Sequence, residues 1–571
     1  MSFILKRSRK KGYKTYLQIV ETHYSPEKKY SVQRLYKKLG DEQALSDSLG
    51  TDAYEYYKKE VDALNRKNAN ERKTLKETLI SETSPLKNIG YFLPHAVYRK
   101  MSMDLYLDIL LSQSDIQCDK KQLLHDLVMA RIVCPSSKKR AYEQVIPSLF
   151  EHGDCTLPQI YELTRFIGEN YQKLIETFNR GITNVIGKRE TGHVYFDCTN
   201  YYFEIDVSDS FRRPGPSKEE RHNPIVGQAL LLDADCIPLG MHLYPGNQSE
   251  KPEIRRIISE MKNQDHITGR TIQVADKGLN CARNIFEAVS NGDGYIYSQS
   301  VMGAGEVEKE WVKLDSAECP YVEVKDKNGE VLYKIKSRKE CIRYKFTDES
   351  GKKIEFSVNQ MRIATFSPSL ARKKKTEILK QAEKAAKLCL SAAKRSEYGD
   401  SSKYVTFVSE SDVKAVVNQD AINEALALAG YNEIITSEIK EKPTAIYSTY
   451  HHLWIIENTF RIMKSQLDAR PVYVQHEDSI KGHFTICYLA VIILRLLQFR
   501  CFEDKISAEQ LTDYIRNFQV TDTGKSEYIN TMRDTPVVKQ VEEVINMGTR
   551  SLIMTEKKIQ KLMKYKFVTR K

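Results

Sequence analysis

Three carboxylates stand in sequence surroundings that favour chemistry on a phosphodiester bond. Asp197 interrupts the apolar and aromatic segment VYFDCTNYYF, and Asp276 directly follows the apolar segment IQVA. Glu457 lies among apolar residues in the segment LWIIENTF. An acid in such surroundings is costly to bury unless it is paired or binds a metal. Carboxylate oxygens are the ligands that Mg²⁺ prefers, and two such ions about 4 Å apart can assist the cleavage of a phosphodiester bond.

Each of these acids also has a simpler interpretation. An aspartate at the end of a strand commonly caps a turn, and a glutamate in a helix commonly lies on the exposed face. None of the three identifies a site by itself, so the prediction depends on their occurrence together and on the residues around them.

Side chains near Glu457 strengthen this prediction. The segment 448–467 is expected to form one helix, which places Tyr450 and Lys464 two turns before and after Glu457 on the same face. Arg461 follows Glu457 by one turn. A cation at these positions could meet a phosphate, and the tyrosine could meet the DNA backbone or stack on a displaced base.

The segments around the two aspartates have the pattern of an α/β fold. Runs of β-branched and aromatic residues predict strands, and apolar residues at three- and four-residue spacing predict helices. The strands are expected at 193–205, within 227–246 as a pair, at 271–278 and at 295–300, and the helices at 251–264 and 282–292. This order is that of an RNase H-like core, in which sites form at the carboxyl ends of strands.

Together these segments resemble the DDE transposases of bacterial insertion sequences, in insertion sequence family four and its close relatives. The resemblance depends on YFDCTNYYFE around Asp197, on VADKGLNCARNI around Asp276, and most on YHHLWIIENTFRIMKSQLDARPVY. The last segment resembles the family signature Tyr-x2-Arg-x3-Glu-x6-Lys, with Leu453 in place of the arginine. A branch of the family has Leu-Trp at this place. PGNQSE (245–250) and the segment 469–493 add to the resemblance, which covers about 190–500.

The resemblance implies an activity and a set of ligands. Asp197, Asp276 and Glu457 would be the catalytic residues and would hold the metal, two Mg²⁺ or Mn²⁺ ions. Water would cleave the DNA at the terminal inverted repeats, and the freed 3′-hydroxyl would then attack target DNA. Tyr450, Lys464 and Arg461 would bind DNA. The partners would be double-stranded DNA and a second copy of the chain, with no membrane, in the bacterial cytoplasm and at the nucleoid during the reaction.

The chain is expected to form an α/β protein, an RNase H-like catalytic core interrupted by a β-rich insertion, with helical N-terminal and C-terminal regions. The resemblance implies the insertion, and strand-like segments at 310–365 stand where it should be. The expected regions are 1–95, basic and binding DNA ends; 96–190, helical; 191–300, first part of the core; 301–418, insertion with a basic helix; 419–500, second part of the core with the Glu457 helix; and 501–571, helical and basic.

Within the first region, a short helix is expected at 29–40 and an exposed charged helix at 55–82.

Composition is consistent with these expectations. The 571 residues carry a net charge of +12, which favours a partner with phosphates. The eleven cysteines form no CxxC pair, which argues against a zinc ribbon or a disulfide framework and favours a reducing cytosol. The N-terminus lacks the apolar core of a signal peptide. The most apolar run, 486–497, contains Arg495 and predicts a buried helix rather than a membrane span.

Other classes of protein remain open at this point. A catalytically inactive, domesticated transposase would bind DNA through the same regions, and another RNase H-like nuclease would share the three acids. The long segment between Asp276 and Glu457 argues against the second alternative. A glycosidase with two carboxylates is disfavoured by the presence of only two tryptophans.

Overall fold

The computed structural model describes residues 2–9, 14–25, 30–77, 84–216, 223–391, 393–408, 415–523 and 526–569. The chain divides into two compact units, Met1–Glu82 and Thr83–Lys571.

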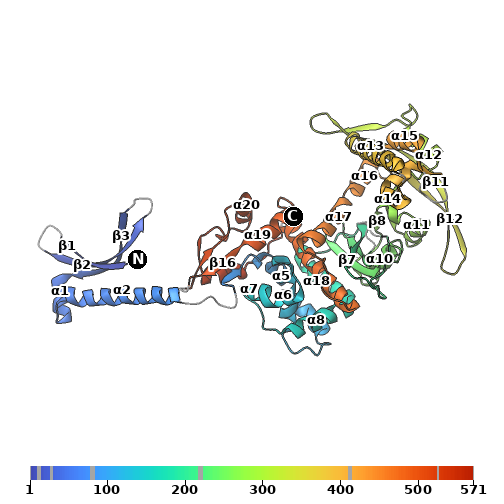
Figure 1. The fold of residues 1–571 in the computed structure, drawn as a ribbon. Coiled ribbons are helices and arrows are strands. Elements are labelled where there is room, and N and C mark those ends of the chain that lie inside the picture. The colour runs from blue at the N-terminus through green and yellow to red at the C-terminus, as the bar shows by residue number, and fades with distance from the viewer. Residues whose placement is uncertain are drawn as a thin grey trace. The chain divides into compact units, whose positions relative to one another are not determined.

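The N-terminal unit is a three-stranded antiparallel sheet followed by two helices (Figure 1). The strands are β1 (Ser2–Arg9), β2 (Thr15–Ser25) and β3 (Tyr30–Asp41), and the helices are α1 (Glu42–Leu49) and α2 (Ala53–Glu77). Leu17 and Ile19 of β2 are buried on the face that the helices cover. The predicted charged helix is confirmed as α2, and its expected end at 78–82 lies outside the described residues.

The helix predicted at 29–40 is wrong, because the described residues of this segment form β3. Most side chains of β3 are exposed, so its apolar residues make no helical face against a core. Backbone pairing with β2 decides its conformation, with two bulges that accommodate extra residues of β3. The N-terminal region is therefore not purely helical.

After the short strand β4 (Leu86–Asn88), the second unit continues with helices, as predicted for 96–190. They are α3 (Phe92–Lys100), α4 (Met103–Leu111), α5 (Lys120–Val133), α6 (Lys138–Arg140), η1 (Ala141–Val145), α7 (Ile146–Ser148), α8 (Leu157–Glu169) and α9 (Tyr171–Ile186). They enclose α18 (Glu477–Leu496), which continues as η5 (Leu497–Cys501). Within the described chain, Glu477–Cys501 is the one helix long and apolar enough to cross a membrane, and 89% of its most apolar window is buried. Burial in the core accounts for its apolar character, as the sequence predicted.

Two glycines allow α8 and α18 to pack closely. A Cβ at Gly482 of α18 would lie 1.8 Å from the carbonyl oxygen of Thr164, and a Cβ at Gly168 of α8 would lie 1.6 Å from that of Asp478. Any side chain at either position would therefore force the two backbones apart.

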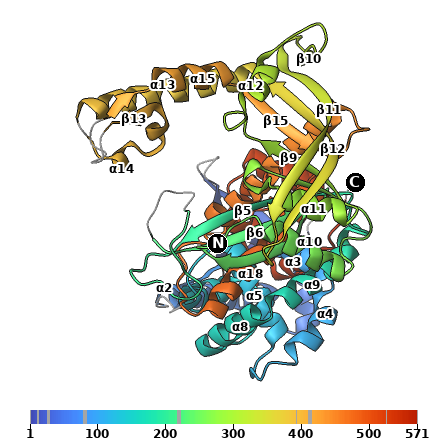
Figure 2. The same ribbon diagram turned by 90° about the vertical axis from the view of Figure 1, so that its right-hand side faces the viewer.

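A nine-stranded mixed sheet forms the centre of the second unit (Figure 2). Its strand order is β10-β11-β12-β15-β9-β8-β5-β6-β7. β5 pairs in parallel with β8, and β8 pairs in parallel with β9, whereas β5, β6 and β7 are joined antiparallel. The five predicted strands are β5 (His193–Tyr202), β6 (Ile225–Leu232), β7 (Pro238–Pro245), β8 (Ile272–Ala275) and β9 (Gly294–Gln299).

Helices cover both faces of this sheet. On one face lie α10 (Glu253–Asn263) and α11 (Ala282–Ser290), whose apolar residues pack on Phe196 and Ala275. On the other face lie α17 (Trp454–Arg461) and α18, which share a core with Tyr195 and Val274. The fold is therefore a mixed α/β fold, as predicted.

The segment after β9 extends the same sheet. β10 (Val322–Lys325), β11 (Val331–Thr347) and β12 (Lys353–Phe366) are antiparallel and join the sheet through β15 (Tyr431–Thr436). Helices α12 (Glu306–Lys313), α13 (Pro368–Leu390), α14 (Arg395–Tyr398), η3 (Gly399–Tyr404) and α15 (Gln419–Leu428) accompany it, with a small hairpin of β13 (Val405–Phe407) and β14 (Ala415–Val417). Figure 2 shows α13 and α15 beside each other at the far end of this extension.

A buried group of charges holds β15 to the extension. Arg362 of β12 donates to Glu433 of β15 at 2.9 Å and to Glu340 at 2.8 Å. Glu433 Oε2 and Glu308 Oε1 are buried without a donor, which is the arrangement of two carboxyl groups that share a proton. Burial first, and then the contact with Glu308, raise the pKa of Glu433 to about 7.

This raised pKa predicts that stability falls as the pH rises. Below pH 4.5, the pKa of the glutamate in the unfolded chain, Glu433 is protonated in both the folded and the unfolded protein. Folding then buries no charge at this position. As the pH rises through the window from 4.5 to about 7, that advantage is lost, by about 1–3 kcal/mol. Glu433→Gln should therefore flatten the pH dependence of the urea midpoint between these values. Parallel wild-type and variant curves would contradict the prediction.

The C-terminal region is not purely helical, which corrects the prediction for 501–571. It contains α19 (Ala508–Asn517), α20 (Pro536–Ile545) and α21 (Glu556–Met563), but also β16 (Gln519–Asp522), β17 (Glu527–Asn530) and β18 (Ile553–Thr555). These strands form a four-stranded sheet with β4 (Leu86–Asn88). Strands of three or four residues show no detectable alternation, and one partner comes from the start of the unit, so the sequence pattern could not predict them.

Candidate active site

Asp197 and Asp276 lie next to each other on parallel strands. The register pairs Phe196 of β5 with Ala275 of β8, and each aspartate is the next residue along its strand direction. Tyr195 and Val274 point into the core under α17 and α18, and side chains alternate along a strand. Both carboxylates therefore point to the face that α17 covers, and both are half-buried.

Backbone and side-chain donors orient these two carboxylates. Asp197 Oδ1 accepts from the backbone N–H of Cys198 at 2.7 Å. Asp276 Oδ1 accepts from the hydroxyl of Ser298 on β9 at 2.9 Å, and Asp276 caps the short helix η2 (Lys277–Leu279).

Glu457 comes to the same face from α17. Ile456 and Phe460 of this helix are buried in the core that contains Tyr195, and α17 contacts β5 directly. Glu457 itself is exposed. The apolar side of α17 thus fixes the helix on the sheet, while the carboxylate stays open to solvent.

The helix predicted at 448–467 is interrupted just before Glu457. α16 (Pro443–His451) ends, His452 and Leu453 form a turn with i to i−3 backbone hydrogen bonds, and α17 then begins. After Arg461 the backbone continues as the π-helix η4 (Ile462–Gln466). The prediction of one continuous helix was wrong, because apolar periodicity does not detect a single tight turn or a change of helix type.

Tyr450 nevertheless lies close enough to the three acids for their charges to act on its hydroxyl group. Its pKa is raised to about 12, first by burial and further by the negative charges of Asp276, Glu457 and Asp197, whereas a hydrogen bond with Ser298 lowers it. The three carboxylates that the sequence singled out are therefore within electrostatic range of one hydroxyl group. Tyr450 remains protonated at neutral pH and can donate a hydrogen bond.

The two predicted cations lie beyond Glu457 along the chain. Lys464 is half-buried in η4, and its Nζ lies 5.2 Å from the centroid of the Tyr201 ring on β5. Arg461 is exposed at the end of α17.

The donor chemistry of this site fits a divalent cation. Asp197, Asp276 and Glu457 offer hard oxygen ligands from three elements on one face. Among the described residues, no three acidic, His or Cys side chains are close enough to enclose an ion as they stand.

A buried arginine that the sequence analysis did not assign holds the Glu457 helix in place. Arg495 of α18 is 1% exposed. Its guanidinium donates to the Ile455 carbonyl at 3.1 Å, to Asn458 Oδ1 at 2.9 Å and to Thr459 Oγ1 at 2.7 Å. These acceptors lie on both sides of Glu457 in the chain. The signal in the sequence was the one charge in the apolar run 486–497.

Burial lowers the pKa of Arg495 to about 10, so the side chain stays charged at neutral pH. Among the described residues, no carboxylate forms an ion pair with it. Arg495 Nη1 donates to Gln498 Oε1, and Gln498 Nε2 donates to Asp504 Oδ1.

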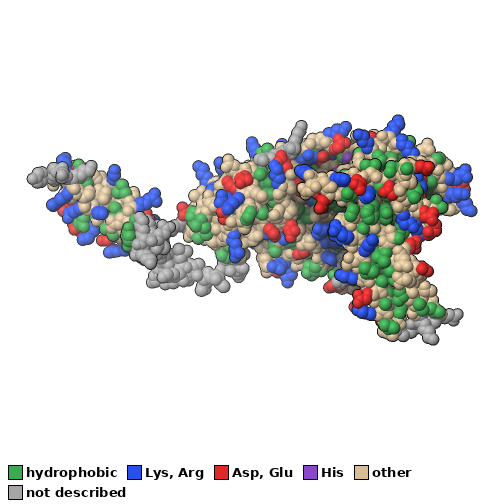
Figure 3. All heavy atoms as spheres, turned by 90° about the horizontal axis from the view of Figure 1, so that it is seen from above, with side chains coloured by type: hydrophobic (Ala, Val, Ile, Leu, Met, Phe, Trp, Pro, Cys, Tyr) green, Lys and Arg blue, Asp and Glu red, His purple; other side chains and the backbone are tan. Residues whose placement is uncertain are grey.

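One cavity is lined by Asp276 itself, and a second is lined by Gly278, two residues further along the chain. A cavity of about 620 Å³ is lined by Asp276, Ser298 and Tyr450 on the sheet side and by Lys374 of α13 and Lys403 of η3 on the other side. Figure 3 shows a hollow on one face of the second unit with Lys and Arg side chains at its edge.

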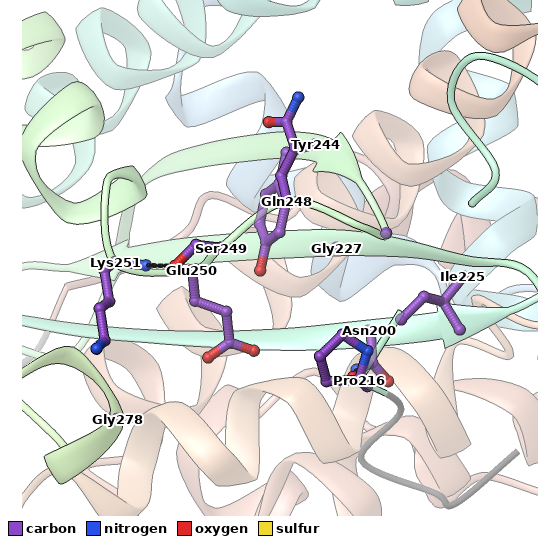
Figure 4. A pocket seen from close by; sticks show the side chains of 11 residues that line it. Asn200, Pro216, Ile225, Gly227, Tyr244, Gln248, Ser249, Glu250, Lys251 and Gly278 are labelled. Carbon is purple, nitrogen blue, oxygen red and sulfur yellow. Dashed lines mark hydrogen bonds between the residues drawn. The ribbon is translucent and has the colours of Figure 1, made fainter. Parts of the chain in front are cut away.

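A second cavity, of about 370 Å³, is lined by residues of the PGNQSE segment (Figure 4). Asn200 and Pro216 face Glu250 and Lys251 across it. Gly246 is required there because a Cβ would lie 2.3 Å from the carbonyl oxygen of Ile225.

Comparison of the sequence with models of known protein families and with curated proteins found no match.

Proposed function

We propose that this chain is a DDE transposase that cleaves DNA at the terminal inverted repeats of a mobile element and joins the freed ends to target DNA. The observation that carries the proposal is the parallel pairing of β5 and β8, which sets Asp197 beside Asp276 on the face that the Glu457 helix covers. The resemblance implies two aspartates from the sheet and a glutamate from a later helix, and here Asp197 lies within β5, Asp276 directly follows β8 and Glu457 lies on α17.

The strand order supports an RNase H-like core. β7, β6, β5, β8 and β9 follow one another in the sheet, with the first three antiparallel and the last three parallel. The extension between β9 and α17 stands where the resemblance implies an insertion.

In this proposal each side chain has a defined task. Asp197, Asp276 and Glu457 would hold two Mg²⁺ or Mn²⁺ ions, which lower the pKa of a water and stabilise the leaving oxygen of the phosphodiester. Tyr450 would donate a hydrogen bond to a phosphate oxygen beside the acids. Lys464 and Arg461 would neutralise phosphates further along the DNA, and cleavage of paired ends would involve two copies of the chain.

The test is cleavage of labelled duplex DNA by the purified protein. The substrate covers the DNA directly outside each end of the coding sequence, and the reaction is run with Mg²⁺, with Mn²⁺ and with EDTA. Nicking that requires the cation, followed by joining of the 3′ end to a second duplex, is the expected result. Binding without cleavage under both cations would favour a DNA-binding relic, and cleavage without joining would favour another nuclease.

Arg495 provides a prediction about positioning in this reaction. Arg495→Met should remove the hydrogen bonds on both sides of Glu457 and lower kcat for cleavage by about 10- to 100-fold, because small displacements of a catalytic group are costly. KM for DNA should change by less than about threefold, since Arg495 is buried and does not reach the DNA.

Arg495→Lys is the matched variant, because it keeps the charge but offers fewer, differently placed donors. It should recover part of kcat. If Arg495→Met changed KM as much as kcat, or if it cleaved DNA at the wild-type rate, the arginine would not position Glu457.

A further inference from the structure

The N-terminal sheet has one face that no described helix covers. At one end of this outer face, the row Ser8, Tyr16 and Asp41 finishes at the carboxylate that caps α1. The three rows beside it are Ser2, Thr22 and Gln33; Ile4, Val20 and Leu35; and Lys6, Gln18 and Lys38. Lys6 Nζ donates to Gln33 Oε1 at 3.1 Å, which places β1 and β3 side chains together on this face. These three rows contain two lysines and no carboxylate.

The opposite face differs in the partners of its cations. There Arg7 forms an ion pair with Glu42 of α1, and Lys37 Nζ lies 3.8 Å from a carboxylate oxygen of Glu60 on α2. On the outer face, within the described residues, neither Lys6 nor Lys38 has an acidic partner, and both are exposed. Helices α1 and α2 thus supply carboxylate partners to Arg7 and Lys37 of the covered face and, within the described residues, none to Lys6 or Lys38.

Apolar side chains are also exposed between these polar rows. Ile4 is 42% and Leu35 46% exposed, on either side of the buried Val20. Together with the lysines and glutamines of the neighbouring rows, they give this face both polar and apolar groups that a partner can contact.

We propose that the outer face of the N-terminal sheet enters the major groove of duplex DNA. Two strand spacings separate β1 from β3, about 10 Å, and the major groove is about 12 Å wide. Lysines can donate to guanine edges or phosphates, glutamines can pair with adenine, and apolar side chains can meet the thymine methyl group.

This inference rests on the proposed function only in taking duplex DNA as the ligand. It is tested by fluorescence anisotropy of the full chain without divalent cations, so that cleavage does not enter. The probe is the duplex that covers the DNA directly outside the coding sequence, and a shuffled duplex of equal length is the reference. The outer-face variant is Lys6→Gln with Lys38→Gln. The matched control is Arg34→Gln with Lys37→Gln, which removes two charges from the opposite face of the same sheet.

The outer-face variant should bind about tenfold or more weakly and show a smaller dependence on salt, whereas the control should stay within about twofold of wild type. Gln33→Ala should reduce the preference for the end duplex over the shuffled duplex. Equal losses in the two double variants, or no loss in the outer-face variant, would overturn the sheet proposal and leave the proposed function standing. Absence of binding by the wild-type protein would overturn both.

Discussion

Replacing Asp197 or Asp276 by asparagine, or Glu457 by glutamine, is expected to lower the rate of metal-dependent DNA cleavage by about three orders of magnitude or more. The amides keep the size of the side chains but remove the negative charge that a divalent cation requires. Affinity for DNA should be unchanged or slightly higher, because each variant removes a negative charge from the surface that phosphates approach. Single-turnover cleavage and binding isotherms separate these two effects.

Asp265→Asn is the matched control for these variants. Asp265 is exposed in the same unit, and its positive φ of 58° is a conformation that asparagine also adopts. It should cleave as the wild type does. Cleavage that survives in all three amide variants would remove these acids from the reaction, even if the protein proved to be a nuclease.

The sequence predicted the parts of the fold in which burial and pattern agree. β5 and β8 combine β-branched or aromatic residues with nearly complete burial, so their composition alone indicates strands. The position of Asp197 within a strand and of Asp276 directly after one followed from that prediction, whereas the parallel pairing that sets them side by side did not. The extension of the sheet through β15 could not be predicted, because the pairing of β12 with β15 joins segments that are distant in the chain.

The errors arise where backbone hydrogen bonding or a local turn decides the structure. Residues 30–41 have few buried side chains, so their apolar spacing carried no information about a core. The turn at His452 and Leu453 divides a segment whose composition is helical throughout, and only the i to i−3 bonds reveal it.

The role of Arg495 was missed for a related reason. Its partners are backbone and neutral oxygens on another helix, and a sequence offers no carboxylate from which to infer such a contact. The arginine that contacts the Glu457 helix from the core is thus Arg495 of α18, whereas Arg461, which spacing had favoured, is exposed.

Gly482→Ala is expected to destabilise the second unit by about 2–4 kcal/mol, although alanine is favoured over glycine in a helix by about 1 kcal/mol. The new Cβ would meet the carbonyl oxygen of Thr164, which belongs to a helix backbone and cannot move aside as a side chain can. Gly168→Ala should have a similar effect, because its Cβ would meet the Asp478 carbonyl. Urea unfolding followed by circular dichroism measures the loss.

Gly305→Ala is the control, because its backbone conformation suits alanine and nothing lies within 4 Å of the added Cβ. It should change the urea midpoint little. Since α18 carries Arg495, separation of α8 and α18 should also lower the rate of DNA cleavage in the fraction that stays folded. If Gly482→Ala had the stability and cleavage rate of the wild type, α8 and α18 could separate without moving Arg495 away from the Glu457 helix. The close crossing of the two helices would then not position the candidate site.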